Sequence, residues 1–347
     1  MKSRFWLGPL ALGSFGLLSC GPERLTESTT SLETPSFAAV GGTWTTKAPM
    51  PTPRANLAAA VQNNSLGQPV LYAIGGFDAG AGPVRTVEAY NFATNTWTNK
   101  ARLPFAITHS NGVGVIGGKL YLAGGFFTTA GGLTGYHPGL NVYDPVRNSW
   151  SKKADMPKRF AQGVSGVING KLYVLSGRCD NCGSTVTKRL YRYDPATDTW
   201  TALPWAPNHH LNGAGGVING KFYVAGGHED NGFGSTNTLD VYDPVTNKWK
   251  TLTPMPTARY GAAAAVLQNK LYIIGKANAD PGEPQNQVEA YDPATNSWTA
   301  KTSLPGAGLG DLTAASVTFQ GRSHIITVGG ADVEGSNPGN VTRVYTP

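Results

Sequence analysis

Short apolar runs recur along most of the chain and end in glycine pairs. The runs at 71–74, 120–123 and 222–225 read Leu-Tyr-Ala-Ile, Leu-Tyr-Leu-Ala and Phe-Tyr-Val-Ala, and each is followed by Gly-Gly. Stretches of small residues such as 56–61 (NLAAAV) precede them, and Asn-Gly-Lys turns such as 169–171 lie between. Because Asn-Gly supplies the positive φ of a tight hairpin turn, the pattern predicts antiparallel β-hairpins.

The second half of each unit carries a tyrosine and, seven residues later, a tryptophan, as in Ala290-Tyr-Asp-Pro-Ala-Thr-Asn-Ser-Trp298. The periodic tryptophans are spaced by 53, 53, 50, 49 and 49 residues, which indicates a radial or solenoid array. Two copies are incomplete, because Trp44 lacks the tyrosine and Tyr345 lacks the tryptophan. Joined, they make one unit, and the chain then holds six. The periodic tryptophans are Trp44, Trp97, Trp150, Trp200, Trp249 and Trp298.

Each unit is expected to form four strands. Small residues suit a crowded innermost strand, and a glycine pair lets two backbones approach closely with unusual φ. Asp-Pro and the following Asn favour a turn in the outer hairpin, since proline presets φ and the polar side chains bond turn amides. The tyrosine and tryptophan would bury large areas between neighbouring units.

Gly-Gly, Tyr-Asp-Pro and Trp in this order, repeated in register about every 50 residues, resemble the kelch repeat over residues 41–347. The resemblance implies an all-β fold, a six-bladed β-propeller with four antiparallel strands per blade. It also implies closure by the N-terminal strand: residues 42–45 would complete the C-terminal blade, whose first three strands end at Tyr345. Closure would leave no sheet edge exposed.

The N-terminus is typical of a bacterial lipoprotein signal. Residues 1–20 combine Lys2 and Arg4 with a short apolar core and end in Leu-Leu-Ser-Cys, which resembles a lipobox with Cys20 as the lipidated residue. The alternative is an ordinary signal peptide with an incidental cysteine. Residues 21–40 are rich in Ser, Thr, Pro and Glu, as in a flexible tether. We therefore expect an extracytoplasmic protein of the cell envelope, held by its lipid alone, with the outer membrane or cell surface favoured.

Composition narrows the class of partner. The chain of 347 residues has 45 Gly and a 40% hydrophobic share, as in a turn-rich globular domain. The formal net charge is +7, of which the signal's Lys2 and Arg4 contribute two. The basic residues are scattered, without the aromatic and basic interleaving of nucleic-acid binders. We expect a monomer that binds no nucleic acid.

Three residues at equivalent places are candidates for anion binding. Each unit begins with a hydrophobic residue and a proline, as in Met50-Pro51, and Arg54, His210 and Arg259 each lie three residues after such a leading proline. In kelch propellers the loops into the innermost strand and the loops after the glycine pair build one face over the central channel. There the three side chains could receive a carboxylate or sulfate. The alternative, which we favour, is that they bond loop carbonyls between blades.

Other residues map to the same face. His228 and Glu229 lie near His209 and His210 in this mapping and could bind a metal or transfer protons, although a solvated polar loop is the favoured interpretation. Phe126 and Phe127 begin a long glycine-rich loop and suggest a contact surface, or a plug for the channel. We expect no metal and no cofactor. The remaining candidates on this face are His109, Arg159 and Tyr260.

Cys179 and Cys182 remain once Cys20 is assigned to lipid. In an oxidising compartment we expect them to form a disulfide that clips their loop. A redox-active pair is the alternative, but such cysteines normally lie at a helix N-terminus, and no helix is predicted here.

These features favour a recognition module for a protein or glycan rather than an enzyme. The alternative is a secreted propeller enzyme acting on carbohydrate. Copper radical oxidases resembling galactose oxidase need a Cys crosslinked to Tyr, and the cysteines here do not match. Sialic acid mutarotases need an acid and an arginine over the channel, which Glu229 with Arg178 or Arg259 could supply.

Overall fold

A computed structural model describes residues 41–110, 112–128, 134–180, 186–229, 234–276, 286–306, 309–331 and 337–347. All of them belong to one compact unit, Phe37–Pro347. Every regular element in these residues is a strand, so the prediction of an all-β fold is confirmed. No helix of the described chain is long and apolar enough to cross a membrane.

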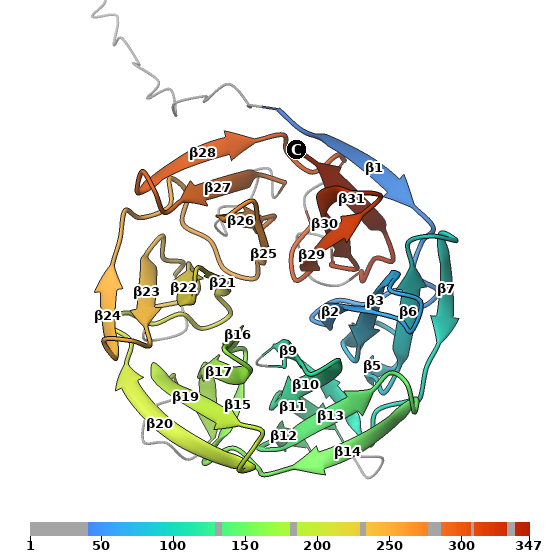
Figure 1. The fold of residues 1–347 in the computed structure, drawn as a ribbon, viewed down its shortest axis with the longest axis horizontal. Coiled ribbons are helices and arrows are strands. Elements are labelled where there is room, and N and C mark those ends of the chain that lie inside the picture. The colour runs from blue at the N-terminus through green and yellow to red at the C-terminus, as the bar shows by residue number, and fades with distance from the viewer. Residues whose placement is uncertain are drawn as a thin grey trace, which may run out of the picture. The chain divides into compact units, whose positions relative to one another are not determined.

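The strands form six four-stranded antiparallel sheets, numbered here in chain order, which Figure 1 shows arranged around a common centre. The first three sheets contain β2 (Ala58–Asn63), β3 (Pro69–Ile74), β6 (Val87–Asn91) and β7 (Thr96–Asn99); β9 (Val113–Ile116), β10 (Lys119–Ala123), β13 (Leu140–Asp144) and β14 (Ser149–Lys153); and β16 (Val164–Ile168), β17 (Lys171–Leu175), β19 (Arg189–Asp194) and β20 (Thr199–Trp205).

The other three sheets contain β21 (Ala214–Ile218), β22 (Lys221–Ala225), β23 (Leu239–Asp243) and β24 (Lys248–Thr251); β25 (Ala263–Leu267), β26 (Lys270–Ile274), β27 (Val288–Asp292) and β28 (Ser297–Lys301); and β29 (Thr313–Phe319), β30 (Arg322–Val328), β31 (Thr342–Thr346) and β1 (Thr43–Lys47). In the sixth sheet β1 pairs with β31, and Trp44 lies opposite Tyr345. The first and last described strands of the chain therefore share one sheet.

Short accessory strands lie in the loops after several glycine pairs and in the loops that lead into the innermost strands, where the sequence predicts no strands. They form small separate sheets because the loop after a glycine pair folds back on the loop into the innermost strand, as β11 does on β8. These strands are β4 (Phe77–Asp78), β5 (Gly82–Pro83), β8 (Ala106–Thr108), β11 (Phe126–Thr128), β12 (Thr134–Tyr136), β15 (Arg159–Ala161) and β18 (Arg178–Asp180).

The hydrophobic core is divided among the interfaces between sheets. Six clusters of buried side chains are present, and each draws its members from two neighbouring sheets. The repeated tyrosines lie in these clusters and are at most 2% exposed. Each periodic Trp ring packs on the tyrosine opposite, with ring centroids 5.1–5.3 Å apart. The predicted packing role of Tyr and Trp is confirmed.

The tryptophans also link each sheet to the next by hydrogen bonds. The indole Nε1 of Trp97 donates to the carbonyl of Ala48, and that of Trp44 to the carbonyl of Thr302, each at 2.9 Å. The other four periodic tryptophans donate in the same way to the preceding sheet, at 2.9–3.1 Å. The links run through all six sheets along the outer strands.

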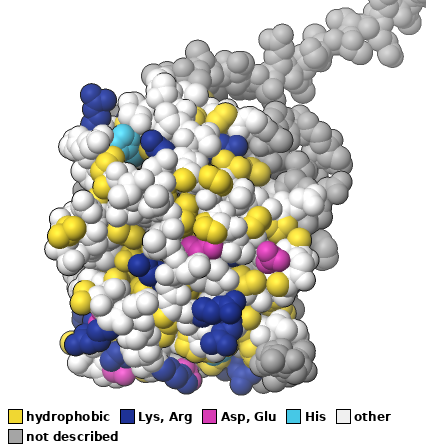
Figure 2. All heavy atoms as spheres, turned by 90° about the vertical axis from the view of Figure 1, so that its right-hand side faces the viewer, with side chains coloured by type: hydrophobic (Ala, Val, Ile, Leu, Met, Phe, Trp, Pro, Cys, Tyr) yellow, Lys and Arg dark blue, Asp and Glu magenta, His cyan; other side chains and the backbone are white. Residues whose placement is uncertain are grey.

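The charged surface matches the dispersed pattern of the sequence. Figure 2, which looks at the rim on the side of β7, shows Lys and Arg in separate groups over the whole face, several of them near its lower edge, with fewer Asp and Glu. Many lysines pair with turn aspartates: Lys171 with Asp194 at 2.6 Å, and Lys270 with Asp292 at 2.8 Å. These pairs are exposed and contribute little to stability.

Candidate functional site

A closed cycle of backbone hydrogen bonds surrounds the centre of the six sheets. One residue from each loop that leads into an innermost strand donates its amide to the carbonyl of the preceding one, at 2.8–3.1 Å, until Asn56 donates to Asp311. All six have positive φ between 48° and 61°. We call them the axial ring; they are Asn56, His109, Gln162, Asn212, Gly261 and Asp311.

The sequence explains why these residues can adopt this backbone. Five of the six lie five residues after a leading proline, and Asp311 lies six after Pro305. Asn, Asp and Gly tolerate a left-handed backbone best, and His is also enriched there. Because the backbone amide and carbonyl of each ring residue bond to other ring residues, the side chains of the five members other than Gly261 are left to line the space at the centre.

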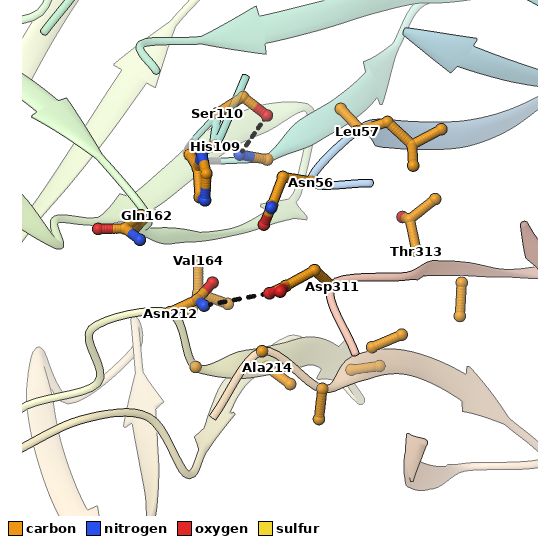
Figure 3. Close-up of a pocket in the computed structure, with 18 of the residues that line it drawn as sticks. Asn56, Leu57, His109, Ser110, Gln162, Val164, Asn212, Ala214, Asp311 and Thr313 are labelled. Atoms are coloured by element: carbon orange, nitrogen blue, oxygen red, sulfur yellow. Dashed lines mark hydrogen bonds between the residues drawn. The ribbon is translucent and has the colours of Figure 1, made fainter. Parts of the chain in front are cut away.

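That space is a pocket of about 220 Å³, bounded by the axial ring and by the first residues of the six innermost strands. In Figure 3 the side chains of Asn56, His109 and Asn212 come from different sheets and face one another across it, and Asn212 is directed toward Asp311. The Asn212 Nδ2 to Asp311 Oδ1 distance is 3.5 Å. The deeper wall consists of small residues such as Ala58, Ala214 and Ala263.

Lys276 places a cation beside this pocket, next to the lining residue Asp311. Its Nζ lies 3.3 Å from Asp311 Oδ2, and the two side chains are 15% and 13% exposed. The ammonium also lies 4.5 Å from the ring centroid of Tyr260, a cation–π contact. Glycines make room for the aliphatic stem, because a Cβ on Gly310 would lie 2.6 Å from Lys276 Cδ. Asp311 is the charged residue among the described residues that line the pocket, so the pair places a fixed dipole at one side of it.

Two histidines near the pocket are held neutral by their surroundings. Burial lowers the pKa of His109; Asp311 opposes the shift, and Lys276 adds to it. Burial likewise lowers the pKa of His228, whose ring stacks on Tyr260 with centroids 3.8 Å apart. At neutral pH, both rings therefore offer one N–H donor and one acceptor. The pocket presents side-chain amides, the neutral imidazole of His109 and the carboxylate of Asp311, with Lys276 paired to that carboxylate from beside the pocket, a set suited to hydroxyl and amide groups.

Comparison with known proteins supports the assignment that the repeat suggested. A family model described as the KLHDC2/KLHL20/DRC7 Kelch-repeats domain matches residues 115–330, and the Kelch motif model matches residues 53–104. The chain belongs to the kelch-repeat family.

Curated kelch relatives match only parts of the chain. Kelch-like protein terF of Aspergillus terreus is 33% identical over 96 residues, which cover 26% of this chain and 20% of terF. Kelch-like protein 38 of Rattus norvegicus is 30% identical over 142 residues, 41% of this chain and 22% of the relative. The chain thus spans about a fifth of the length of these relatives.

The solved structure of YjhT has the same fold. It superimposes with a TM-score of 0.70 and covers 85% of this chain and 95% of its own, at 20% sequence identity. At that identity the likeness concerns the β-propeller fold alone.

Arg54, His210 and Arg259 do not face the channel mouth, so the hypothesis of an anion site there, which the sequence favoured less, is wrong. All three are at most 1% exposed and lie inside their kelch units. Arg54 donates to the carbonyls of Gly75 and Thr86 and pairs with Glu88 at 2.7 Å. The favoured alternative, hydrogen bonds to loop carbonyls, is therefore correct in its partners, but the bonds lie within one kelch unit and not between units.

Arg259 and His210 repeat this arrangement in two other kelch units. Arg259 pairs with Glu289 at 2.7 Å, and burial raises the pKa of Glu289 although Arg259 and Thr257 oppose it. His210 Nε2 lies 3.1 Å from Asp240 Oδ2. Burial alone would raise the pKa of Asp240, but hydrogen bonds to His210 and other donors outweigh it and lower the pKa. These groups stabilise the units and do not reach the pocket.

The other predicted residues are dispersed. His109 lines the pocket, and Tyr260 contacts Lys276 beside it. Phe126 and Phe127 are half-buried in β11, between β8 and β12, rather than in a loop. Arg159 and Glu229 are exposed. No group of three His, Cys, Asp or Glu in the described part of the chain is placed to hold a metal ion.

The cysteine prediction falls partly outside the described residues. Cys179 is disulfide-bonded and packs in the core between the second and third sheets. Cys182 and Cys20 lie outside the described residues, as does the whole of residues 1–40.

The sequence interpretation missed most of the pocket. Asn56, Gln162 and Asn212 carry a usable signal, since residue types that tolerate positive φ recur five residues after the leading proline. Lys276 carries another. It replaces the second glycine of the pair, which in four other units has φ between 101° and 119°. A break in a repeated glycine pair marks the unit in which a side chain enters the axial region.

Proposed function

We propose that the six sheets are the blades of a closed kelch propeller, and that this propeller is a recognition module for a glycan or protein. The bound group enters the axial pocket from the face of the loops that lead into the innermost strands. The observation that carries the proposal is the axial ring: six residues, one from each loop that leads into an innermost strand, bond one another through their backbones, and the five that are not glycine hold polar side chains around one space.

The size and chemistry of the pocket indicate which chemical groups it could bind. A volume of about 220 Å³ is below the usual range for a drug-sized ligand, roughly 300–1,000 Å³, and suits one terminal sugar or one side chain. Asn56, Gln162 and Asn212 each offer amide donors and an acceptor. Asp311 and Lys276 add an acceptor and a donor of opposite charge. A ring of hydroxyls or a short amide-bearing group matches this alternation.

We further propose that the module works at the cell envelope as a monomer. Lipid on Cys20 would hold the chain at a membrane, and residues 21–40 would be a tether long enough to free the propeller from the surface. The test is phase partitioning in detergent after expression in a bacterium. The wild type should enter the detergent phase, and Cys20→Ser should remain in the aqueous phase.

A panel of immobilised glycans and peptides tests recognition by the axial pocket. The compact unit, residues 37–347, is applied as wild type, as Asp311→Asn and as Asp292→Asn. Asparagine keeps the positive φ at position 311 and removes only the charge. Asp292 makes the same charge change in a turn of the outer hairpin, away from the pocket. A binding signal lost in the first variant and kept in the second supports the proposal; equal signals for all three contradict it.

A second candidate is catalysis of sugar anomerisation, favoured by the convergence of a carboxylate, an ammonium and a neutral imidazole on one pocket. Asp311 would take the anomeric hydroxyl proton while Lys276 gives a proton to the ring oxygen, and both would return on closure. The paired cation is a lysine, not the arginine expected of mutarotases. NMR exchange between the anomers of N-acetylneuraminic acid tests it: a rate equal to the uncatalysed rate excludes this activity.

A further inference from the structure

A second pocket opens on the third kelch unit, away from the axial ring. Its volume is about 570 Å³, and it lies among β15, β19 and β20. Figure 1 shows β20 on the outer edge of the molecule, on the far side of its sheet from the innermost strand β16. The floor is apolar and aromatic, and the wall carries Trp205. We call it the lateral groove.

Trp205 is the unusual residue of this groove. It is 55% exposed, although tryptophan is normally among the more buried side chains. It does not belong to the repeat, because the other units carry Pro, Arg, Asp, Pro and Ser at this place, five residues after the periodic tryptophan. An exposed aromatic ring that no packing role explains indicates a contact surface.

A β-bulge aims this side chain. The register between β19 and β20 shifts between Arg189 and Tyr191, so that Arg189 lies opposite Trp205 while Tyr191 lies opposite Ala202. One extra residue in β20 turns its end, and such bulges commonly redirect a side chain at a functional site. The guanidinium of Arg189 lies 5.5 Å from the centroid of the Trp205 ring.

The floor of the groove is formed by residues that differ in type from those at the equivalent positions of other kelch units. Two kelch units bury an Arg–Glu ion pair, such as Arg54 with Glu88, and another buries a histidine against an aspartate. At the equivalent positions this unit has Phe160 and Tyr191, whose ring centroids are 5.5 Å apart. In the third unit, aromatic rings therefore lie where those units have polar side chains that hydrogen-bond to each other. Thr187 is the polar residue beside them.

The charges of the groove all have one sign. Lys158, which is exposed, and Arg189 are its charged residues, and none of the described residues lining it is acidic. Arginine binds carboxylates with two parallel hydrogen bonds. A ligand that fits must therefore combine a flat apolar face for the indole, whose π face attracts C–H bonds, with a nearby anion.

We propose that the lateral groove binds a carboxylated sugar unit of an acidic glycan. The sugar's apolar face lies on Trp205, its carboxylate meets Arg189 and Lys158, and its hydroxyls reach Thr187. The site is separate from the axial pocket, and either can fail without the other.

Calorimetry on residues 37–347 tests the proposal with three probes: tetramers of galacturonate, of mannuronate and of glucuronate-containing hyaluronan. The methyl ester of the best binder is the matched neutral ligand. We expect at least one tetramer to bind, and its ester to bind about tenfold more weakly or worse. Trp205→Ala and Arg189→Gln should each weaken binding about tenfold or more. Arg147→Gln removes an exposed cation elsewhere and should have no effect.

Three results would overturn the proposal: no binding of any tetramer, equal binding of acid and ester, or unchanged binding by Trp205→Ala. Binding only to acidic peptides on the same instrument would also overturn it. If Trp205→Ala unfolds, the double variant Trp205→Phe, Lys158→Gln replaces it in the same measurement, because Lys158 is exposed and its loss should not affect folding. This double variant should also bind the tetramer more weakly than the wild type, and unchanged binding would overturn the proposal. Asp311→Asn changes only the axial pocket and must leave binding in the lateral groove intact. A failure of the lateral-groove proposal can therefore be told apart from a failure of the proposed function of the axial pocket.

Discussion

At the scale of single residues, one structural position is filled in several chemically different ways. Three residues after the leading proline, Arg54 pairs with Glu88, whereas the second unit has Ile107 and Asn141 at the two equivalent positions of its sequence. The position of Arg54 in the repeat could be predicted, but the orientation of its side chain is set by the carboxylate of Glu88, 34 residues later in the chain. That carboxylate stands two residues before the repeated tyrosine in every unit with such a pair. The partner can therefore be identified from the sequence once the two positions are compared.

Removing Arg54 alone should lower the free energy of unfolding strongly. Replacing both residues of the pair by those of the second unit should restore much of that stability. Arg54→Ile leaves Glu88 as an uncompensated buried charge, which costs about 3–5 kcal/mol in the free energy of unfolding. The double variant Arg54→Ile, Glu88→Asn removes that charge. Urea unfolding measures both. A loss below about 1 kcal/mol in the single variant, or no recovery in the double variant, would contradict the account.

At the scale of the element, the outer hairpin does more than its sequence suggested. The predicted turn is present, since Asp292 Oδ1 accepts the amide of Ala294 at 2.9 Å. The Asn of the motif was assigned only to that turn. In the structure Asn296 accepts the hydroxyl of Tyr291 at 2.7 Å and the amide of Thr253 in the preceding sheet. A contact with another repeat cannot be read from one copy of a motif.

The same hairpins should make the protein sensitive to alkali. Burial raises the pKa of Tyr90, Tyr291 and Tyr345 to about 12, against an ordinary value of about 10. Stability from these protonated phenols is complete below about pH 10 and is lost as pH rises through about 12. The urea midpoint should fall over this window, while absorbance at 295 nm shows these tyrosines still protonated at pH 11. Complete ionisation near pH 10 with native circular dichroism would exclude the burial described here.

At the scale of the whole molecule, two sets of links join the six sheets, the axial ring at the centre and the Trp Nε1 bonds at the outside. Each innermost strand contacts the innermost strands of two neighbouring sheets. The period of the tryptophans predicted the six sheets, because packing between repeats demands the same aromatic residues each time. The face over the central channel was predicted as the binding surface, with His109 on it, but most residues that line the axial pocket and the whole lateral groove were not. Lys276 beside the pocket and Trp205 in the groove break the repeat, and no local pattern marks the bulge.

Removal of β1 tests the role of the split sheet. Deleting residues 41–47 exposes the edge of β31, the Tyr345 ring and the carbonyl of Thr302. We expect Tm to fall by roughly 5 °C or more and aggregation to increase, because an open edge strand invites pairing with another chain. The control begins at residue 41 and should match the chain that begins at residue 21. An unchanged Tm in the deletion would show that β1 is dispensable.

The most direct test of the central claim, recognition at the axial pocket, is an NMR titration of the six histidines with the compound that binds best on the panel. His109 lines the pocket, whereas His324 bonds Thr346 at 2.9 Å in the sixth sheet, and His109→Asn assigns the first resonance. The account predicts that the imidazole signals of His109 shift at saturation while those of His324 stay in place. An unshifted His109 at full occupancy would contradict it.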